Sequence, residues 1–350
     1  MILVTGGAGF IGSNFLLEWF KNSTTSRESI VNLDALTYAG NRENLKSLDG
    51  DSRHVFVSGD ICDRALIDDV LSEYRPRAII NFAAETHVDR SIAESGIFVA
   101  TNVLGIHSLL EAALVYWGSL SGDERKFFRF VQVSTDEVYG SLVHGAPSFV
   151  EGDRVCPNNP YSASKAAAEH LVRAWWSTYG LPTLTVNPCN NYGPRQHREK
   201  LIPKVIWNAL TGMPIPIFGD GQQMRSWLHV RDNCRAIRAV LEFGLPGESY
   251  NIGPGEERSN ADIVSTLCTL LDKLHPHPKK SYSDLVTNTA DRPGHDRRYA
   301  LNCRKIFLHA GWRQHETLSG SLEETIIWYL ETWTGRSFSN HDRHRRSSGF

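Results

Sequence analysis

Two short segments, YSASK at 161–165 and STDEVYG at 134–140, contain the residue types that proton transfer at a hydroxyl group requires. Tyr161 and Lys165 lie four positions apart and therefore share one face of a helix. A lysine cation beside a phenol lowers the phenol pKa, so that the phenolate can act as a base near neutral pH. Because such pairs are common on protein surfaces, the pair alone does not define a site.

The second segment follows an apolar run that we expect to be a strand, and open α/β sheets place their chemistry at the carboxyl ends of strands. Thr135 would supply a hydroxyl donor, so that the three residues together offer a donor (Thr135), a base (Tyr161) and a cation (Lys165). Asp136 and Glu137 are adjacent carboxylates, which are costly to bury unless they are used or solvated. A polar loop after the strand is the alternative interpretation of these two side chains.

A glycine-rich segment near the N-terminus, TGGAGFIG, predicts a dinucleotide-binding turn. Gly6, Gly9 and Gly12 are spaced G-x-x-G-x-x-G between an apolar strand and a helix. Such glycines permit a tight turn, close approach of the backbone to a pyrophosphate and close packing of helix on strand. The N–H groups at the helix N-terminus attract phosphate. A plain glycine turn is the alternative, and the strand–turn–helix–strand context disfavours it.

Asp34 ends the second predicted strand, about 20 residues after the glycines, where an acidic side chain holds a ribose 2′-hydroxyl group. It would repel a 2′-phosphate, so NAD is favoured over NADP unless Arg42 offsets the repulsion. The ends of the third and fourth strands are expected to meet the adenine and to leave room for the dinucleotide. The expected cofactor-binding residues are Gly6, Gly9, Phe10, Ile11, Gly12, Asp34, Thr37, Asp60, Ile61, Ala83, Ala84, Tyr161 and Lys165.

The elements that must position these residues alternate along the first half of the chain. Short apolar runs without polar alternation are typical of strands buried on both faces, and helical patterns separate them, with long helices expected at 91–117 and 160–179. Strand–helix alternation predicts a doubly wound parallel sheet, the Rossmann form of the α/β class. The expected strands are 2–4, 30–33, 55–57, 78–82, 128–133 and 183–186.

The residue pattern of the second half of the chain predicts a smaller, discontinuous domain. Prolines and glycines interrupt the pattern after residue 188, while a helix at 230–244 and a strand at 249–253 are expected to return to the sheet. The cofactor domain is therefore predicted to comprise 1–188 and about 226–253, and the substrate domain about 189–225 and 254–334. The remaining residues, 335–350, are expected to form a flexible tail.

Composition excludes several classes of protein. With 37 basic and 39 acidic residues the net charge is −2, which argues against a nucleic-acid-binding surface. No apolar run reaches the length of a membrane span, and the N-terminus lacks the features of a secretory signal. The six cysteines show no C-x-x-C spacing. A cytoplasmic protein with reduced thiols and no metal site is expected.

The segments TGGAGFIGS, STDEVYG and YSASK together resemble the extended short-chain dehydrogenase/reductase family that acts on nucleotide sugars. Further segments narrow the resemblance to the 4,6-dehydratases of that family, from residue 1 to about 334. The specific signal is Asp136-Glu137, since related epimerases and decarboxylases usually carry other residues there. The narrowing segments are LTYAGNRENL (36–45), AAETHVDRSI (83–92), NNYGP (190–194), EKLIP (199–203), YNIG (250–253) and DRPGHDRRYA (291–300).

The resemblance implies a hydro-lyase that converts dTDP-glucose to dTDP-4-keto-6-deoxyglucose with tightly bound NAD, recycled in each turnover. Tyr161 takes the O4 proton while C4 gives hydride to NAD, Thr135 holds the same oxygen, and Lys165 tunes Tyr161 and binds the nicotinamide ribose. Glu137 then removes the C5 proton, and Asp136 protonates the departing O6. Two carboxylates in different environments can divide the acid and base roles in this way.

The resemblance also implies a set of residues around the anionic nucleotide sugar. Arg225 suits its pyrophosphate because a guanidinium matches phosphate geometry, although a surface salt bridge is the alternative for any single cation. Phe218 stands where the family commonly has Tyr, and Ser226 where an Asp often follows the Arg, so thymine and uracil both stay open. The expected substrate-binding residues are Glu85, Asn190, Lys200, Leu201, Pro216, Phe218, Arg225, Asn260, Arg292 and His295.

Other interpretations stay open. They are the same chemistry on a UDP-sugar, a UDP-sugar 4-epimerase or decarboxylase, and a catalytically silent NAD-binding regulatory protein. The family resemblance further implies a homodimer in which the helices at 91–117 and 160–179 form a four-helix bundle, because both carry apolar residues, such as Leu114 and Leu171, beyond one face. Burial of those faces within one chain is the alternative.

Overall fold

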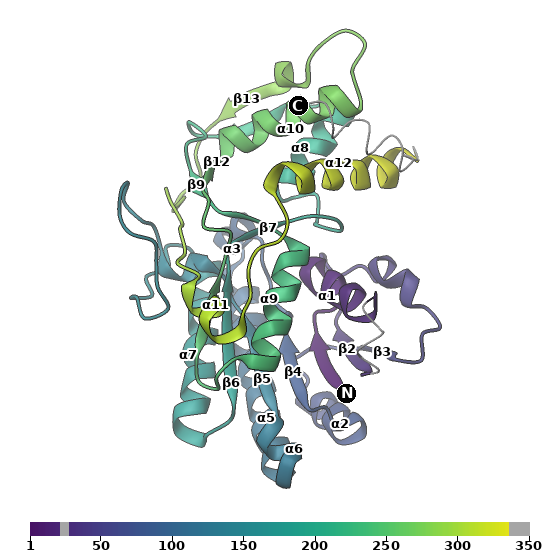
Figure 1. Ribbon diagram of the computed structural model, residues 1–350, viewed down its shortest axis with the longest axis vertical. Coiled ribbons are helices and arrows are strands. Elements are labelled where there is room, and N and C mark those ends of the chain that lie inside the picture. Colours follow the sequence, from purple (N-terminus) through teal and green to yellow (C-terminus); the bar gives the residue numbers. More distant parts are fainter. Residues whose placement is uncertain (22–27, 336–350) are drawn as a thin grey trace.

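The computed structural model describes residues 1–21 and 28–335, so the predicted tail lies outside the described residues from 336 on. A seven-stranded sheet with the order β11-β6-β5-β4-β1-β2-β3 forms the larger part of the molecule (Figure 1), and every neighbouring pair in it is parallel. The prediction of a doubly wound parallel sheet is confirmed. Its strands are β1 (Ile2–Thr5), β2 (Ile30–Asp34), β3 (His54–Ser58), β4 (Ala78–Asn81), β5 (Arg129–Val133), β6 (Thr183–Pro188) and β11 (Ser249–Ile252).

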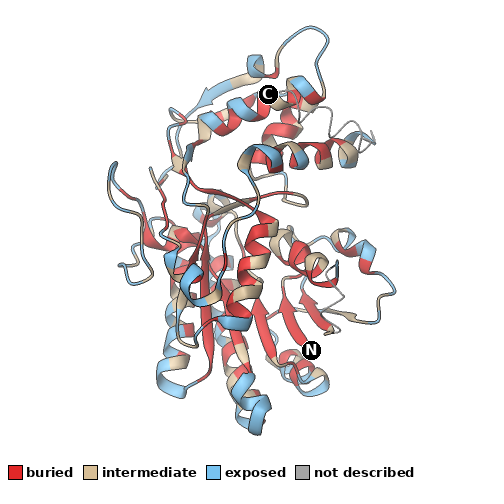
Figure 2. Cartoon of the chain, in the orientation of Figure 1, coloured by how far each residue is buried: buried red, intermediate tan, exposed pale blue. Residues whose placement is uncertain are grey.

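Helices cover both faces of the sheet, and most of its strands are buried (Figure 2). On β1, Ile2 and Val4 join one apolar cluster and Leu3 joins the other, as the two-residue period of a strand requires. The first cluster includes side chains of α1 (Phe10–Lys21), α9 (Val230–Phe243) and α11 (Arg304–Ala310). The second includes side chains of α2 (Arg64–Tyr74), α5 (Ile106–Ser119) and α7 (Pro160–Tyr179).

The smaller part lies beyond one end of the sheet and has its own apolar cluster (Figure 1). It contains α8 (Leu201–Thr211), α10 (Asn260–Leu274) and α12 (Leu318–Thr334). Three two-stranded sheets accompany these helices. They pair β7 (Asn190–Tyr192) with β10 (Trp227–His229), β8 (Ile215–Phe218) with β13 (Val286–Thr289), and β9 (Met224–Arg225) with β12 (Arg258–Ser259).

The chain returns to the larger part twice. α9 packs beside α1, and β11 pairs with β6 at the edge of the sheet. The structure differs from the predicted domain boundaries at α11. This helix lies within 254–334, the range predicted for the substrate domain, but it packs against α9 and β11 of the larger part. Its Ile306 side chain is fully buried in the apolar cluster on the sheet.

The helix predicted at 91–117 is interrupted. α3 (Val88–Ala93) ends at Glu94, whose φ of −137° is not helical, and α4 (Ser95–Val99) begins after it. A π-helical turn, η2 (Ala100–Gly105), then leads into α5. π-turns inside helices are frequent at functional sites. The other short helices are η1 (Arg42–Leu48), α6 (Gly122–Phe127), η3 (Asp136–Tyr139) and η4 (Tyr282–Leu285).

The helix predicted at 160–179 is α7, whose ends are set by local signals. The Asn159 side chain accepts a hydrogen bond from Ser162 N, Pro160 occupies the first turn, and Gly180 ends the helix in the left-handed conformation. The helical stretch 95–119 is long and apolar enough by composition to cross a membrane, with 44% of its most apolar window buried. In the fold this stretch packs against α2 and α7, so it also contributes to the apolar core of the larger part.

Candidate active site

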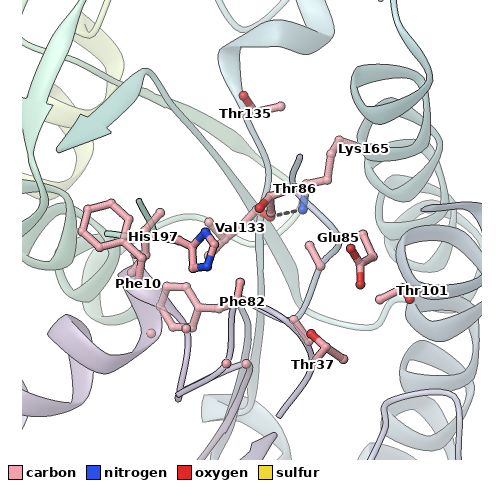
Figure 3. A pocket seen from close by; sticks show the side chains of 18 of the residues that line it. Phe10, Thr37, Phe82, Glu85, Thr86, Thr101, Val133, Thr135, Lys165 and His197 are labelled. Carbon is pink, nitrogen blue, oxygen red and sulfur yellow. Dashed lines mark hydrogen bonds between the residues drawn. The ribbon is translucent and has the colours of Figure 1, made fainter. Parts of the chain in front are cut away.

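A cavity of about 280 Å³ lies at the carboxyl ends of the strands, between the two parts of the molecule (Figure 3). Its walls come from the turn after β1, the ends of β2 to β5, the start of α7 and the chain that follows β6. Parallel strands end at one edge of a sheet, so segments far apart in the sequence meet there, where α/β proteins bind their ligands. All thirteen residues expected to bind the cofactor line this cavity.

The glycine turn is held in a conformation that side chains would prevent. Gly6 has a φ of +69°, and a Cβ there would stand 2.6 Å from Ala83 N. A Cβ on Gly12 would stand 2.3 Å from Gly6 O. The Asp34 carboxylate accepts hydrogen bonds from Ala8 N and Leu36 N, both at 2.7 Å, while its burial raises its pKa. Asp34 therefore also orders the turn that it faces.

The cavity suits a polar, extended ligand such as NAD. The side-chain oxygens Asn190 Oδ1, Asn191 Oδ1 and Gln196 Oε1 are buried in its wall without hydrogen-bond partners. Buried polar groups are ordinarily paired, so a ligand that pairs them fits the site. Within residues 1–21 and 28–335, no group of three His, Cys, Asp or Glu side chains is arranged to hold a metal ion.

Several lining residues were not selected from the sequence. Asn191 and Glu199 stood inside recognised motifs, so their neighbours pointed to them. Thr101 lines the cavity from the π-helical turn, and no motif or spacing pointed to it. The neighbouring Asn102 holds the loop after β4, since its side chain accepts from Glu85 N at 2.9 Å and donates to Glu85 O at 3.0 Å.

Tyr161, Lys165 and Thr135 meet in this cavity. Lys165 Nζ donates to Val133 O at 2.7 Å, and burial lowers the pKa of Lys165 to about 8, against the opposing charge of Glu169. Burial also raises the pKa of Tyr161, the charge of Glu137 adds to the effect, and a hydrogen bond with Thr135 opposes it. The expected lowering of the phenol pKa by Lys165 is therefore not observed here, because the ammonium turns toward a backbone carbonyl.

The two adjacent carboxylates have different surroundings. Asp136 is 2% exposed, and burial, followed by the charge of Glu137, raises its pKa to about 8. Asp136 is therefore protonated at neutral pH and can donate a proton. Glu137 is only half-buried and accepts a hydrogen bond from Ser162 Oγ at 3.1 Å. The buried carboxyl group of Asp136 thus keeps its proton and is placed to act as the acid, beside Glu137, which is placed to act as the base.

Of the ten expected substrate-binding residues, three line the cavity: Glu85, Asn190 and Lys200. Lys200 Nζ donates to Thr86 O at 2.8 Å. Glu85 is buried, which raises its pKa, and lies 3.2 Å from Arg90 in an ion pair.

The other seven lie in the smaller part: Leu201, Pro216, Phe218, Arg225, Asn260, Arg292 and His295. Arg225 is buried over the Tyr299 ring at 4.2 Å and donates to Asp296 O at 2.7 Å. Its charge acts on Asp136 and Glu137, and the charge of Arg292 acts on both Arg225 and Lys200. Lys200 and Arg225 therefore act on the carboxylate pair from separate segments, and Arg292, which pairs with Asp89 at 3.5 Å, acts on both of these cations.

Comparison with known proteins places this site in a family. The profile described as "GDP-mannose 4,6 dehydratase" matches residues 3–325. A dTDP-glucose 4,6-dehydratase of Neisseria gonorrhoeae is 50% identical over 339 residues, covering 96% of this chain and 97% of the relative. The dTDP-glucose 4,6-dehydratase 1 of Escherichia coli K12 is 49% identical over 337 residues, covering 94% of this chain and 92% of the relative.

Solved structures agree in fold. The dTDP-glucose 4,6-dehydratase DesIV of Streptomyces venezuelae, with NAD and TYD bound, superposes with a TM-score of 0.86 at 42% identity, covering 95% of this chain and 98% of that one. The UDP-glucose 4-epimerase of Thermotoga maritima, with UDP-glucose, reaches 0.81 at 27% identity, covering 95% and 99%. The fold and the Tyr–Lys site together define an extended short-chain dehydrogenase/reductase.

The chain belongs to the GDP-mannose 4,6 dehydratase family and, within it, to the dTDP-glucose 4,6-dehydratases. The expectation of an NAD-dependent hydro-lyase of this group is confirmed. What each side chain does in the reaction is a separate question, which the geometry addresses.

Proposed function

We propose that this chain dehydrates dTDP-glucose to dTDP-4-keto-6-deoxyglucose, with the acid and base roles divided between Asp136 and Glu137. The observation that carries the assignment is the contrast between these two side chains: Asp136 is buried and its pKa is raised, whereas Glu137 is half-buried and accepts a hydrogen bond from Ser162 Oγ. An enzyme that only oxidises and reduces C4 needs no such pair, which disfavours an epimerase or a decarboxylase.

The first step is oxidation at C4. NAD, when bound, accepts the hydride from C4 and supplies the hydride that C6 later receives. Tyr161 takes the proton from O4, and Thr135, its hydrogen-bond partner, holds the same oxygen. Lys165, a cation below its pKa of about 8, lies one helical turn from Tyr161, and its role in this step is to bind the nicotinamide ribose. The resulting 4-ketone makes the C5 proton more acidic.

The second step is loss of water across C5 and C6. Glu137 removes the C5 proton, and the electron pair left at C5 forms the double bond to C6 as the C6–O bond breaks. Asp136 gives its proton to the departing oxygen, which leaves as water. The proton on Glu137 exchanges with solvent, and after C6 has gained its hydride, C5 takes a proton from Glu137. Tyr161 releases the O4 proton to solvent and solvent reprotonates Asp136, so all three side chains return to their starting protonation states.

Lys200, Arg225 and Arg292 supply positive charge for the two negative charges of the nucleotide pyrophosphate. Phe218, whose ring centroid lies 6.3 Å from that of His295, offers an apolar surface for the base. Glu85 and Asn190, which line the cavity, are proposed to contact the sugar nucleotide from the larger and the smaller part of the chain. We take thymine as the base because the most similar relatives that we compared act on dTDP-glucose.

The exposed apolar face of the stretch 95–119 supports a homodimer. Val99 is 49% exposed, Leu104 61% and Val115 64%, which is unusual for side chains of this kind on a helix that otherwise packs into the core. Pairing with a second copy through a four-helix bundle of this stretch and α7 would cover them. A cytoplasmic location fits the six cysteines, which are all free thiols.

The function is tested by incubating the purified chain with dTDP-glucose, UDP-glucose and UDP-GlcNAc in separate reactions. We expect dTDP-glucose alone to lose one water, by mass spectrometry, and to take up deuterium at C5 when the reaction runs in heavy water. Dehydration of a UDP-sugar instead would reassign the substrate. Inversion at C4 without loss of water would replace the proposal with an epimerase.

A further inference from the structure

A short connecting segment, residues 194–200, contributes four residues to the lining of the cofactor cavity and is hydrogen-bonded to the larger part near both of its ends; we call it the strap. At its start, Asn14 of α1 donates to Pro194 O at 2.9 Å, and Arg195 donates to Asn14 Oδ1 at 3.3 Å. Between its ends, Gln196 and His197 line the cavity. Figure 3 shows the His197 ring among the side chains that line the cavity.

The far end of the strap is held by Glu199. Tyr38, in the loop after β2, donates from its hydroxyl to Glu199 Oε1 at 3.3 Å. His87, in the loop after β4, has Nε2 3.5 Å from Glu199 Oε2. The side chain of Glu199 is only 15% exposed. One carboxylate of the smaller part therefore meets two loops of the larger part.

The contact with His87 does not require a charged imidazole. His87 caps α3, since its Nδ1 accepts a hydrogen bond from Arg90 N at 3.1 Å. A nitrogen that accepts carries no proton, so the neutral ring has its proton on Nε2, the nitrogen that faces Glu199. The helix cap thereby fixes the tautomer that can donate to the carboxylate.

Neighbouring groups keep Tyr38 in place as a donor. Its ring lies edge-on to His197, with centroids 5.7 Å apart, and the Arg90 guanidinium lies 5.1 Å from its centroid. Burial raises the pKa of Tyr38 to about 12, so the hydroxyl keeps its proton. The two cations nearest Glu199 within the strap are His197 Nδ1, if protonated, at 3.3 Å and Lys200 Nζ at 3.9 Å.

We propose that Glu199 is a cofactor-retention residue, which holds the strap closed over bound NAD through Tyr38 and His87. The inference rests on the proposed function in taking NAD as the ligand of this cavity. In that reaction the cofactor must remain on the protein between the first and last steps, because the hydride it takes from C4 is the one that C6 receives. A closure that links both parts of the molecule slows its escape without touching the reacting atoms.

The test measures release of NAD from the holoenzyme. The protein is loaded with radiolabelled NAD, chased with excess unlabelled NAD, and sampled by rapid desalting over time. We expect Glu199→Gln, which keeps the shape but removes the charge, to release label about tenfold faster, and Glu199→Ala faster still. Tyr38→Phe keeps both ring contacts and loses only the hydroxyl donor, so a smaller acceleration is expected.

His87→Asn isolates the imidazole contact, because asparagine can still cap α3 but cannot reach as far. Glu43→Gln is the matched control: its carboxylate lies on η1, is 74% exposed and pairs only with Lys46 among the contacts described, so wild-type release is expected. As a second readout, the activity of Glu199→Gln should come to depend on added NAD, with a half-saturating concentration about tenfold above that of the wild type.

The outcomes separate the two proposals. Label that never binds to the wild-type protein would overturn the proposed function. Wild-type protein that retains label, together with Glu199 variants that release it at the wild-type rate, would overturn the retention role alone. If Glu199→Ala does not fold, Glu199→Gln and Tyr38→Phe still decide the question, because both conserve size.

Discussion

Asp136 offers the sharpest test of the site, because its burial links stability to catalysis. Its carboxyl group has a pKa of about 8 in the folded protein, against 3.8 in an unfolded chain, mainly because burial disfavours the charged form. Asp136→Asn keeps the shape of the side chain but cannot ionise. We expect the variant to lose the proton donor for elimination and to become more stable than the wild type as the pH rises.

The size of the stability effect follows from the two pKa values. Between them the folded state holds one more proton at Asp136 than the unfolded state, so this contribution to the free energy of unfolding is fully present below pH 3.8 and is lost as the pH rises through about 8. The loss is about 1.4 kcal/mol per pH unit within that window. From pH 5 to pH 7 the variant should therefore gain about 2.7 kcal/mol on the wild type.

The assay is urea unfolding of both proteins at pH 5, 6 and 7 with saturating NAD. Other titrating groups are common to both proteins and largely cancel in the difference. Product formation by the variant should fall by a factor of about 10² to 10⁴, the usual contribution of a positioned acid. A difference in unfolding free energy that stays constant with pH would show that Asp136 ionises at an ordinary pKa and is not stored as an acid.

Four further outcomes are expected. Glu137→Gln should accumulate the near-ultraviolet absorbance of reduced cofactor on mixing with dTDP-glucose but form no dehydrated product; failure to accumulate it would overturn the division of roles. Tyr161→Phe should give neither signal, because C4 oxidation itself is blocked. Asn159→Ala should lower the free energy of unfolding by about 1 kcal/mol through loss of the α7 cap, measured in urea. Leu104→Arg should convert a dimer to a monomer by light scattering, whereas Leu308→Arg, equally exposed on α11, should not; a dimer in both would place the interface elsewhere.

The elements that the sequence predicted well are those whose signals are local. Asn159, Pro160 and Gly180 delimit α7 by their own conformational preferences, so the ends of that helix could be predicted without knowledge of its neighbours. The strands were recognisable because burial on both faces leaves an apolar run. The prediction of one helix over 91–117 was wrong at Glu94, which takes a non-helical conformation just before Ser95-Gly96, a turn signal that the apolar pattern of the stretch outweighed.

In the candidate site, too, residues with a local sequence signal could be predicted, and residues placed only by the fold could not. The cofactor residues were predictable because the Gly6–Gly12 turn and the strand ends each have a recognisable sequence context. Thr101 was missed because only a π-helical turn brings it to the cavity. The effect of Lys165 on Tyr161 was expected from spacing alone, yet spacing does not show that the ammonium turns to the Val133 carbonyl.

The sequence by itself predicted the class of sheet, the kind of cofactor and the candidate reacting side chains, because motifs and periodicity are properties of contiguous residues. The family resemblance assigned the acid role to Asp136, and only the tertiary structure supplied a physical reason for it, the burial that raises its pKa. The pKa of Asp136 depends on its burial and on the charges of Glu137 and Arg225, and Arg225 lies on a distant strand. The closure of Glu199 on Tyr38 likewise joins residues far apart in the chain, since electrostatic fields and contacts act through space and not along the sequence.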